Sequence, residues 1–223
     1  MGSAFRTLGT LEELGFLAQD ASTKRYRLGL RVLDLGQACL SGMVFPHVAL
    51  PFLEELASTT RRSANMAVLD GADIVFVARA SVTRLMSVNL SVGSRLPSHC
   101  TSMGKVLLAD LDEDERKDLF DSAELRRYTA RTITSVLELE QALHAIRAQG
   151  FAISREELEP HLTTMAAPVR DATGRTVAAI NVAMFSGPGE EVDTFEGDVL
   201  LKVLDSARVV SAALGYRPGR SRA

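Results

Sequence analysis

The chain has 223 residues, enough for one large domain or for a medium domain with a small appendage, and its apolar fraction of 46% allows a sizeable core. The net charge of −3 lacks the strongly basic balance that is typical of nucleic-acid binders. The two cysteines, Cys39 and Cys100, lie far apart, so we expect reduced thiols and no disulfide framework. No run approaches the roughly 18 apolar residues of a membrane span, and the N-terminus has no signal-peptide pattern. We therefore expect a soluble protein of the cytoplasm.

The N-terminal part of the chain predicts a helix, a hairpin and a second helix. Apolar residues recur every three positions over residues 5–14 and favour a helix that Gly15 ends. Two short apolar runs flank the polar, basic stretch "ASTK" and predict a hairpin over residues 16–28. The stretch "LGLRVLDLGQACLSG" then predicts a helix that Gly42 ends.

A mixed region follows a domain boundary that we place near residues 42–46. Pro46 and Pro51 punctuate the next segment, and an amphipathic pattern predicts a helix over residues 48–61. Apolar, β-branched runs around an Asp-Gly pair indicate a hairpin over residues 63–80. Other strands are expected at 85–93, 151–156, 162–171 and 176–185, and other helices at 101–111, 112–120, 135–150 and 192–214. Adjacent hairpins and intervening helices predict an α+β fold with an antiparallel sheet.

The stretch "LPSHCTSMGKVLLADL", residues 96–111, concentrates chemically active side chains. Ser102 and Lys105 have the S-x-x-K spacing of a serine nucleophile and a lysine base, and they would share one helix face. The S-D-N and K-T-G stretches of serine acyl enzymes are missing. A phosphate-binding loop is rejected because Val106 follows Lys105, where that motif needs Ser or Thr. A small hydrolase that uses Ser102 or Cys100 stays open as the enzyme alternative.

A metal site at the same stretch is disfavoured. Neighbours on a strand point to opposite faces, so His99 and Cys100 would not both reach one ion. His161, with Glu156 or Glu157, would have to supply further ligands, and the sequence contains neither C-x-x-C nor H-E-x-x-H. We therefore expect no metal and no cofactor.

A simpler interpretation of this stretch is ligand binding without chemistry. Residues 98–101 lie where a strand gives way to a helix, and Thr101 or Ser102 would cap the first turn of that helix. The free amides of such a turn form a receptor for an anion or a carboxylate. Small polar side chains and a neutral His99 would complete a cradle for a small acid.

Three blocks of the sequence, in matching order, carry a family resemblance. The blocks are "TLEELGFLAQDASTKRYRLGLRVLDLG", "SVGSRLPSHCTSMGKVLLADL" and "LHAIRAQGFAISREELEPHLTTMAAPVRDATGRTVAAINVAMFSGP". They resemble, respectively, the wing hairpin with its linker helix, the effector-domain signature and the second conserved block of the IclR family of transcription regulators. The similarity covers residues 5–217. The stretch "RLMSVNLSVGSRLPSHCTSMGKVLLA" is most similar to the subgroup of this family that controls protocatechuate and β-ketoadipate catabolism.

The resemblance implies a winged helix-turn-helix that a helix joins to a GAF-like effector domain of antiparallel sheet and flanking helices. It implies dimers through the DNA-binding part and often tetramers through the effector domains. It also implies that small organic acids bind the effector domain and alter operator binding. The expected domains are a remnant of the winged helix-turn-helix over 1–28, the linker helix over 29–44, the effector-binding domain over 45–217 and a disordered tail over 218–223.

The resemblance further implies a set of effector-binding positions. They are Leu85, Val88 and Leu96 as an apolar wall, Ser102 and Met103 at the amide cradle, and Ser154, Thr164, Asn181 and Ala183 on the opposite side. Core packing is the alternative interpretation of the three apolar residues. We add His99 from its own chemistry. Arg155 could pair with a carboxylate, but a surface role is favoured for it and for His161.

Two departures from the family pattern matter. The N-terminal part is short, and only the last turns of the recognition helix, at residues 4–14, precede the wing, so we expect this chain not to read an operator by itself. Lys24 and Arg25 could still contact phosphates, which position a protein on DNA without specifying sequence. In the pocket, Met103 is bulky where a small residue is common, and Ala183 lacks a hydroxyl donor. Glyoxylate is therefore not the expected effector.

The leading hypothesis is a transcriptional regulator, not an enzyme, whose effector domain binds a small organic or aromatic acid and modulates operator binding at aromatic-acid catabolic genes. Its expected partners are a small carboxylate, operator DNA when the N-terminal domain is intact, and further copies of the chain in a homodimer or homotetramer; a membrane is not expected. The alternatives are the hydrolase described above and a stand-alone sensor domain that forms mixed oligomers with full-length partners.

Overall fold

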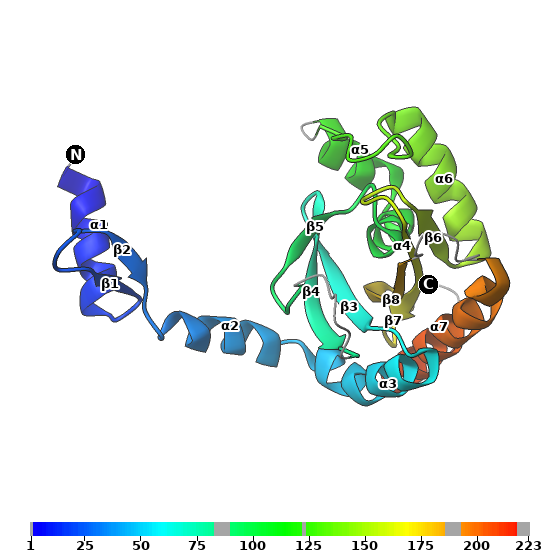
Figure 1. The fold of residues 1–223 in the computed structure, drawn as a ribbon, viewed down its shortest axis with the longest axis horizontal. Coiled ribbons are helices and arrows are strands. Elements are labelled where there is room, and N and C mark those ends of the chain that lie inside the picture. The colour runs from blue at the N-terminus through cyan, green and yellow to red at the C-terminus, as the bar shows by residue number, and fades with distance from the viewer. Residues whose placement is uncertain (1, 83–89, 122–123, 186–192, 218–223) are drawn as a thin grey trace. The chain divides into compact units, whose positions relative to one another are not determined.

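The computed structural model describes residues 2–82, 90–121, 124–185 and 193–217 (Figure 1). The chain divides into two compact units, Met1–Val44 and Phe45–Ala223, and each is described by itself. Within the described residues, no single helix is both long enough and apolar enough to cross a membrane.

The N-terminal unit places a hairpin between two helices. Its elements are α1 (Gly2–Glu13), β1 (Leu17–Gln19), β2 (Tyr26–Leu28) and α2 (Val32–Ser41). Helix α1 begins earlier than predicted, whereas α2 begins later. The late start of α2 has a physical cause, because the amide of Gly29 donates a hydrogen bond to the carbonyl oxygen of Phe16 (2.8 Å) and so extends the hairpin pairing.

The turn of this hairpin is ordered by Asp20. Its carboxylate accepts hydrogen bonds from the Ser22 hydroxyl (2.6 Å) and from the amides of Ser22 (2.9 Å) and Thr23 (2.7 Å). These bonds, led by the one from the Ser22 hydroxyl, hold the pKa of Asp20 well below its usual range. Lys24, which has a positive φ of 56°, and Arg25 follow as exposed residues. The two basic side chains therefore project from a hydrogen-bonded turn.

The second unit is built on a six-stranded antiparallel sheet. Its strand order is β5-β4-β3-β8-β7-β6. The strands are β3 (Ala64–Asp70), β4 (Asp73–Ala80), β5 (Arg95–Pro97), β6 (Ala152–Arg155), β7 (Leu162–Arg170) and β8 (Thr176–Phe185). Because β3 pairs with β8, the first hairpin of this unit lies beside the last one, and residues more than a hundred positions apart become cross-strand neighbours.

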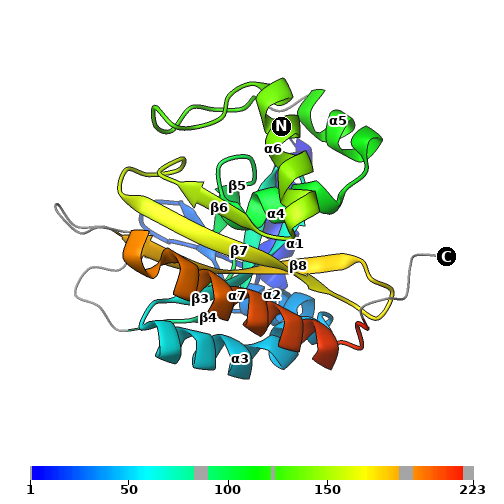
Figure 2. The ribbon, with the colours of Figure 1, turned by 90° about the vertical axis from the view of Figure 1, so that its right-hand side faces the viewer.

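Helices cover both faces of the sheet (Figure 2). They are α3 (Val44–Thr60), α4 (Ser102–Asp110), α5 (Glu113–Asp121), α6 (Val136–Gln149) and α7 (Asp193–Ala213). Helix α7 packs on β7 and β8 on one face, where α3 runs beside it. Helix α4 contacts β6, β7 and β8 on the other face and is covered in turn by α6. Residues 102–109 of α4 are all buried, so α4 is the central helix of the fold.

The predicted α+β fold is confirmed, and α3 differs from its predicted bounds. Helix α3 begins at Val44, before the predicted residue 48, because Pro46 lies in its first turn, where a missing amide proton is tolerated. Pro51 lies inside the same helix. The strand predicted at 85–93 falls outside the described residues up to position 89, and residues 90–93 lead into a turn in which the amide of Ser94 donates to the carbonyl oxygen of Ser91 (2.9 Å). The predicted disordered tail, 218–223, also lies outside the described residues.

Candidate ligand-binding cavity

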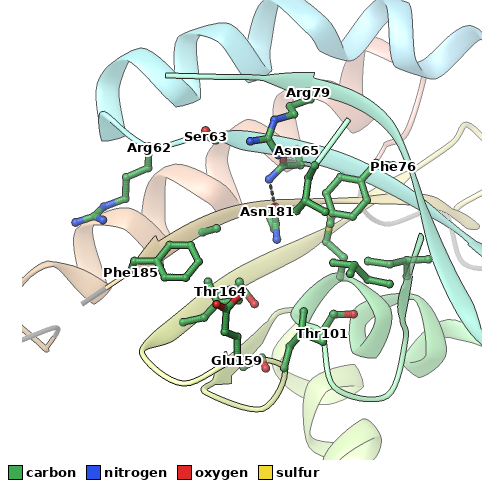
Figure 3. A pocket seen from close by; sticks show the side chains of 18 of the residues that line it. Arg62, Ser63, Asn65, Phe76, Arg79, Thr101, Glu159, Thr164, Asn181 and Phe185 are labelled. Atoms are coloured by element: carbon green, nitrogen blue, oxygen red, sulfur yellow. Dashed lines mark hydrogen bonds between the residues drawn. The ribbon is translucent and has the colours of Figure 1, made fainter. Parts of the chain in front are cut away.

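A cavity of about 730 Å³ lies between the start of α4 and the face of the sheet (Figure 3). This volume is typical of small-molecule sites, which usually span about 300–1,000 Å³. Apolar side chains form most of its wall, among them Ile74, Phe76, Leu90, Leu96, Leu158, Leu162 and Phe185. Among the described residues, the charged side chains of the lining are Arg62, Arg79 and Glu159, so cations outnumber anions there.

Two rows of cross-strand partners, polar except for Ala183, cross the sheet under this cavity. Ser154, Thr164 and Ala183 are direct cross-strand partners on β6, β7 and β8. Arg79, Asn65 and Asn181 are direct partners on β4, β3 and β8. Alternate residues of a strand point to the same face, so Asn181 and Ala183 bring the two rows onto one surface. All six residues line the cavity.

The row on β4, β3 and β8 is linked by side-chain hydrogen bonds. Arg79 Nη1 donates to Asn65 Oδ1 (3.0 Å), and Asn65 Nδ2 donates to Asn181 Oδ1 (2.8 Å). Arg79 Nε donates to the hydroxyl of Ser81 (2.8 Å). Arg79 is half-buried, and this burial lowers the pKa of its guanidinium.

The start of α4 forms the opposite side of the cavity. Thr101 is the N-cap, as one of the two predicted alternatives required, and its hydroxyl accepts a hydrogen bond from the amide of Gly104 (3.2 Å). Thr101 and Met103 line the cavity. Helix geometry gives the first amides of a helix no intrahelical acceptor, and the positive end of the helix dipole lies at the same place. This end of the cavity is therefore suited to an anion.

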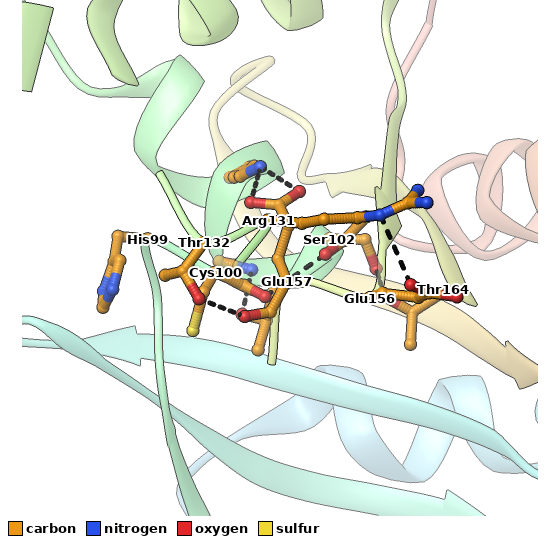
Figure 4. A network of polar contacts seen from close by, with 12 residues as sticks. His99, Cys100, Ser102, Arg131, Thr132, Glu156, Glu157 and Thr164 are labelled. Carbon is orange, nitrogen blue, oxygen red and sulfur yellow. Dashed lines mark hydrogen bonds and ion pairs between the residues drawn. The ribbon is translucent and has the colours of Figure 1, made fainter. Parts of the chain in front are cut away.

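Hydroxyl groups hold the start of α4 against the sheet (Figure 4). The Ser102 hydroxyl donates to Thr164 Oγ1 (2.8 Å), and the Ser154 hydroxyl donates to the carbonyl oxygen of Cys100 (3.2 Å). Ser102 is completely buried and is not among the lining residues. Ser102 therefore joins α4 to β7 beneath the cavity and is not an exposed hydrogen-bond donor.

Six of the predicted site residues come together around the cavity. They are Leu96, Met103, Ser154, Thr164, Asn181 and Ala183. Ser102 lies behind them, and Leu85 and Val88 lie outside the described residues. Arg155 and His161 are exposed and are not among the lining residues.

His99 is not brought to the cavity. Its Nε2 atom lies 3.0 Å from the carbonyl oxygen of Arg126, and its ring lies beside that of Tyr128 with the centroids 6.2 Å apart. The side chain is buried, and this burial lowers the pKa of the imidazole. The turn before α4 directs the ring toward residues 126–128, so the role of His99 as an effector ligand stays a prediction that the cavity lining does not support.

Sequence reasoning missed the charged and amide groups of β3 and β4. Asn65 and Arg79 both line the cavity, and Asn65 is 2% exposed. A usable signal was present, since an amide and a guanidinium interrupt the apolar runs of the hairpin over residues 63–80. Buried polar groups need partners, and polar positions within an apolar strand therefore deserve a functional explanation.

The geometry does not assemble the predicted enzyme alternative. Lys105 forms a buried ion pair with Glu157, and the Ser102 hydroxyl is bonded to Thr164, so the S-x-x-K pair is not joined as nucleophile and base. Burial raises the pKa of the Cys100 thiol to about 12, which keeps the thiol protonated and a poor nucleophile at neutral pH. Among the described residues, no group of three His, Cys, Asp or Glu side chains is placed to hold a metal ion.

The fold and the cavity define a class of protein. It is an α+β domain in which a curled antiparallel sheet and the start of helix α4 enclose a cavity of the size of a small molecule. The sequence profile described as "Bacterial transcriptional regulator IclR C-terminal" matches residues 37–212. The chain belongs to the IclR family. The family resemblance predicted from the three sequence blocks is thus confirmed.

Two curated relatives illustrate the relationship. The Pca regulon regulatory protein of Pseudomonas putida is 42% identical over 183 residues, which is 82% of this chain and 62% of the relative. The transcriptional regulator KdgR of Escherichia coli K12 is 31% identical over 214 residues, which is 96% of this chain and 81% of the relative. The chain therefore spans less than two thirds of the length of the Pca regulon protein.

Solved structures agree with this assignment. A protein from Rhodococcus sp. RHA1 superimposes with a TM-score of 0.82 at 40% identity and covers 96% of this chain and 84% of its own. The inducer-binding domain of PobR from Acinetobacter, a double mutant in complex with 3-hydroxybenzoic acid, gives a TM-score of 0.67 at 32% identity. That comparison covers 74% of this chain and 97% of the PobR domain.

Proposed function

We propose that this chain is the effector-sensing part of a cytoplasmic transcriptional regulator and that its cavity binds a small organic or aromatic carboxylate. Binding would change the affinity of a homo-oligomeric regulator for an operator of aromatic-acid catabolic genes. The observation that carries the proposal is the electrostatic character of the cavity. Among the described residues, the lining contains Arg79, Arg62 and the positive end of α4, against the single carboxylate of Glu159.

Arg79 contributes most to this electrostatic character. Its guanidinium donates hydrogen bonds to the neutral side chains of Asn65 and Ser81, and within the described residues no carboxylate forms an ion pair with it. A half-buried cation that no carboxylate of the described residues pairs with stabilises an anion that enters the same cavity, because the interior screens the attraction less than water does. An acid is therefore the favoured ligand.

The remaining wall favours an aromatic or aliphatic body on that acid. Phe76, Ile74 and Leu96 line one side, and Leu162 and Phe185 line another. An apolar wall that includes two aromatic rings is suited to burying a ring or a short chain. The bound 3-hydroxybenzoic acid of the PobR domain, a relative with the same fold, is an example of such a ligand in that protein.

The N-terminal unit supplies the proposed link to DNA. The hairpin of β1 and β2 carries Lys24 and Arg25 on the turn that Asp20 orders, and we assign them to phosphate contacts. An effector alters operator binding only if it binds two arrangements of the regulator with unequal affinity. A coupling free energy of about 1–3 kcal/mol is sufficient for useful switching.

Isothermal titration with protocatechuate, 4-hydroxybenzoate, benzoate, β-ketoadipate, pyruvate and glyoxylate tests the proposal. At least one acid other than glyoxylate should bind reversibly and be recovered unchanged. Ala183→Phe places a ring in the cavity and should weaken that binding at least tenfold, whereas Ala145→Phe, at an exposed position of α6, should not. The absence of binding by every acid, or equal binding by both variants, would refute the proposed site. Turnover of an ester by the chain would instead support the hydrolase alternative.

A further inference from the structure

We propose that Arg79 and Asn65 are positioning residues that fix the side-chain amide of Asn181 as a hydrogen-bond donor toward the cavity. The ligand would then be an aromatic acid with two separated acceptor groups: a carboxylate for the start of α4, and a carbonyl or other acceptor oxygen for Asn181. This inference rests on the proposed function and deepens it, because it assigns a chemical requirement to one wall of the cavity.

The three side chains form a row across three neighbouring strands. Asn65 lies directly opposite Arg79 on one side and directly opposite Asn181 on the other. The donor-to-acceptor distances along the row are 3.0 Å and 2.8 Å. Asn65 and Asn181 are 2% and 6% exposed, so water competes little with these bonds.

The direction of the row follows from donor chemistry. A guanidinium only donates, so it requires the oxygen of the Asn65 amide. The nitrogen of Asn65 must then face Asn181 and requires its oxygen in turn. The nitrogen of Asn181 is left to face away from Asn65. The charge on Arg79 thus determines which end of a neutral amide, two strands away, is turned outward.

Figure 3 shows the resulting orientation of the Asn181 side chain. The nitrogen of Asn181 points away from Asn65 and toward the side of the cavity where Thr164 lies. Asn181 lines the cavity, so this nitrogen presents hydrogen-bond donors to a ligand. A ligand with an amino group at that point would leave two donors facing each other, and each would be buried without an acceptor.

Asn65→Asp reverses the orientation of the Asn181 amide with almost no change in the shape of the side chain at position 65. One aspartate oxygen accepts from Arg79, and the other faces Asn181, so the Asn181 amide must turn its nitrogen toward Asp at position 65 and its oxygen toward the cavity. Ser63→Asp is the matched control, since it adds the same charge to the cavity wall without joining the row. Asn65→Leu removes both polar groups and leaves the Asn181 amide free to turn either way.

The experiment is titration calorimetry with benzoate, 3- and 4-formylbenzoate, and 3- and 4-aminobenzoate. These probes share the carboxylate and differ in an acceptor or a donor at one ring position. The unmodified chain and Ser63→Asp should each prefer one of the two formylbenzoates. They should bind it about tenfold more tightly than the aminobenzoate substituted at the same ring position. Asn65→Leu and Arg79→Met should bring that ratio close to one, and Asn65→Asp should invert it.

A purely structural role for Asn65 predicts a different result. Every variant at position 65 would then lose affinity equally for the formylbenzoates and for the aminobenzoates. Equal affinity of the unmodified chain for the formylbenzoate and the aminobenzoate would overturn the inference while leaving the proposed function intact. An unchanged affinity ratio in both Asn65→Asp and Arg79→Met would do the same. Failure of benzoate and all its derivatives to bind would overturn the inference, and the proposed function would fall with it only if the other acids of the wider panel also failed. Thermal unfolding of each variant verifies that it is folded before titration.

Discussion

Lys105 and Glu157 form a buried ion pair that joins α4 to the segment between β6 and β7. Their side chains are 4% and 10% exposed. Leu158 and Glu159 follow Glu157 directly and line the cavity, as do Thr101 and Met103 at the start of α4. The pair therefore ties one wall of the cavity to the helix that forms another.

Breaking this pair should be costly. Lys105→Met leaves the Glu157 carboxylate buried without its partner, and we expect the free energy of unfolding to fall by about 3 kcal/mol or more. Urea unfolding followed by circular dichroism measures the change. Replacing both residues, in Lys105→Met with Glu157→Leu, should recover most of the loss because no charge is then buried. A loss below about 1 kcal/mol in the single variant would contradict the burial of the pair.

Gly104 should tolerate no side chain. A Cβ atom at this position would overlap the carbonyl oxygen and Cα atom of Ser98, which are backbone atoms that have little freedom to move. Gly104→Ala should therefore lower the free energy of unfolding by about 2 kcal/mol or more. Gly197→Ala is the matched control in α7, where nothing lies within 4 Å, and should raise stability by up to about 1 kcal/mol. Equal effects of the two changes on the unfolding midpoint would contradict the close approach at Ser98.

His99 should make the fold sensitive to mild acid. Burial lowers the pKa of its imidazole, so below the unfolded value of about 6.5 the unfolded chain takes up a proton that the folded chain does not. The contribution of His99 to the free energy of unfolding is therefore lost as the pH falls from 7.5 to 5.5. The slope is a fraction of the roughly 1.4 kcal/mol per pH unit that one full proton would give. Urea unfolding at the two pH values should show a smaller drop for His99→Gln than for the unmodified chain.

The carboxyl group of Asp110 does not obscure this comparison. The pKa of Asp110 is lowered by hydrogen bonds from Thr176 and Arg170, which outweigh its burial, and its contribution is lost only as the pH falls below the unfolded value of about 3.9. That range lies under the window used for His99. An identical drop in His99→Gln and the unmodified chain would show that the imidazole is protonated equally in both states.

The hairpin residues should act through charge rather than sequence. Lys24→Ala with Arg25→Ala should weaken binding to a fluorescent duplex of arbitrary sequence and reduce the slope of log affinity against log salt by about 1 per phosphate contact removed. Fluorescence anisotropy at several salt concentrations gives both quantities. Lys202→Ala with Arg208→Ala removes the same charge from α7 and is the control. An equal change of slope in the two double variants would exclude a specific role for the hairpin.

Local pattern was enough to predict most elements of the second unit. The apolar periods over 135–150 and 162–185 correspond to α6, β7 and β8, and the Asp-Gly pair lies in the turn between β3 and β4. The cap at Thr101 was also within reach, because capping depends on the few residues around a helix start. Errors arose where a distant partner competes with the local signal, as when Phe16 keeps Gly29 out of α2.

The sequence by itself determined the kinds of element, their order and the family, because helix and strand periodicity and three ordered blocks are properties of short stretches. Only the tertiary structure decided that β3 pairs with β8, which places Asn65 beside Asn181, 116 positions away. It also decided that Lys105 pairs with Glu157 instead of activating Ser102, and that His99 turns away from the cavity. The physical reason is that strand register and burial are set by contacts across the whole sheet, and no local window contains both partners of such a contact.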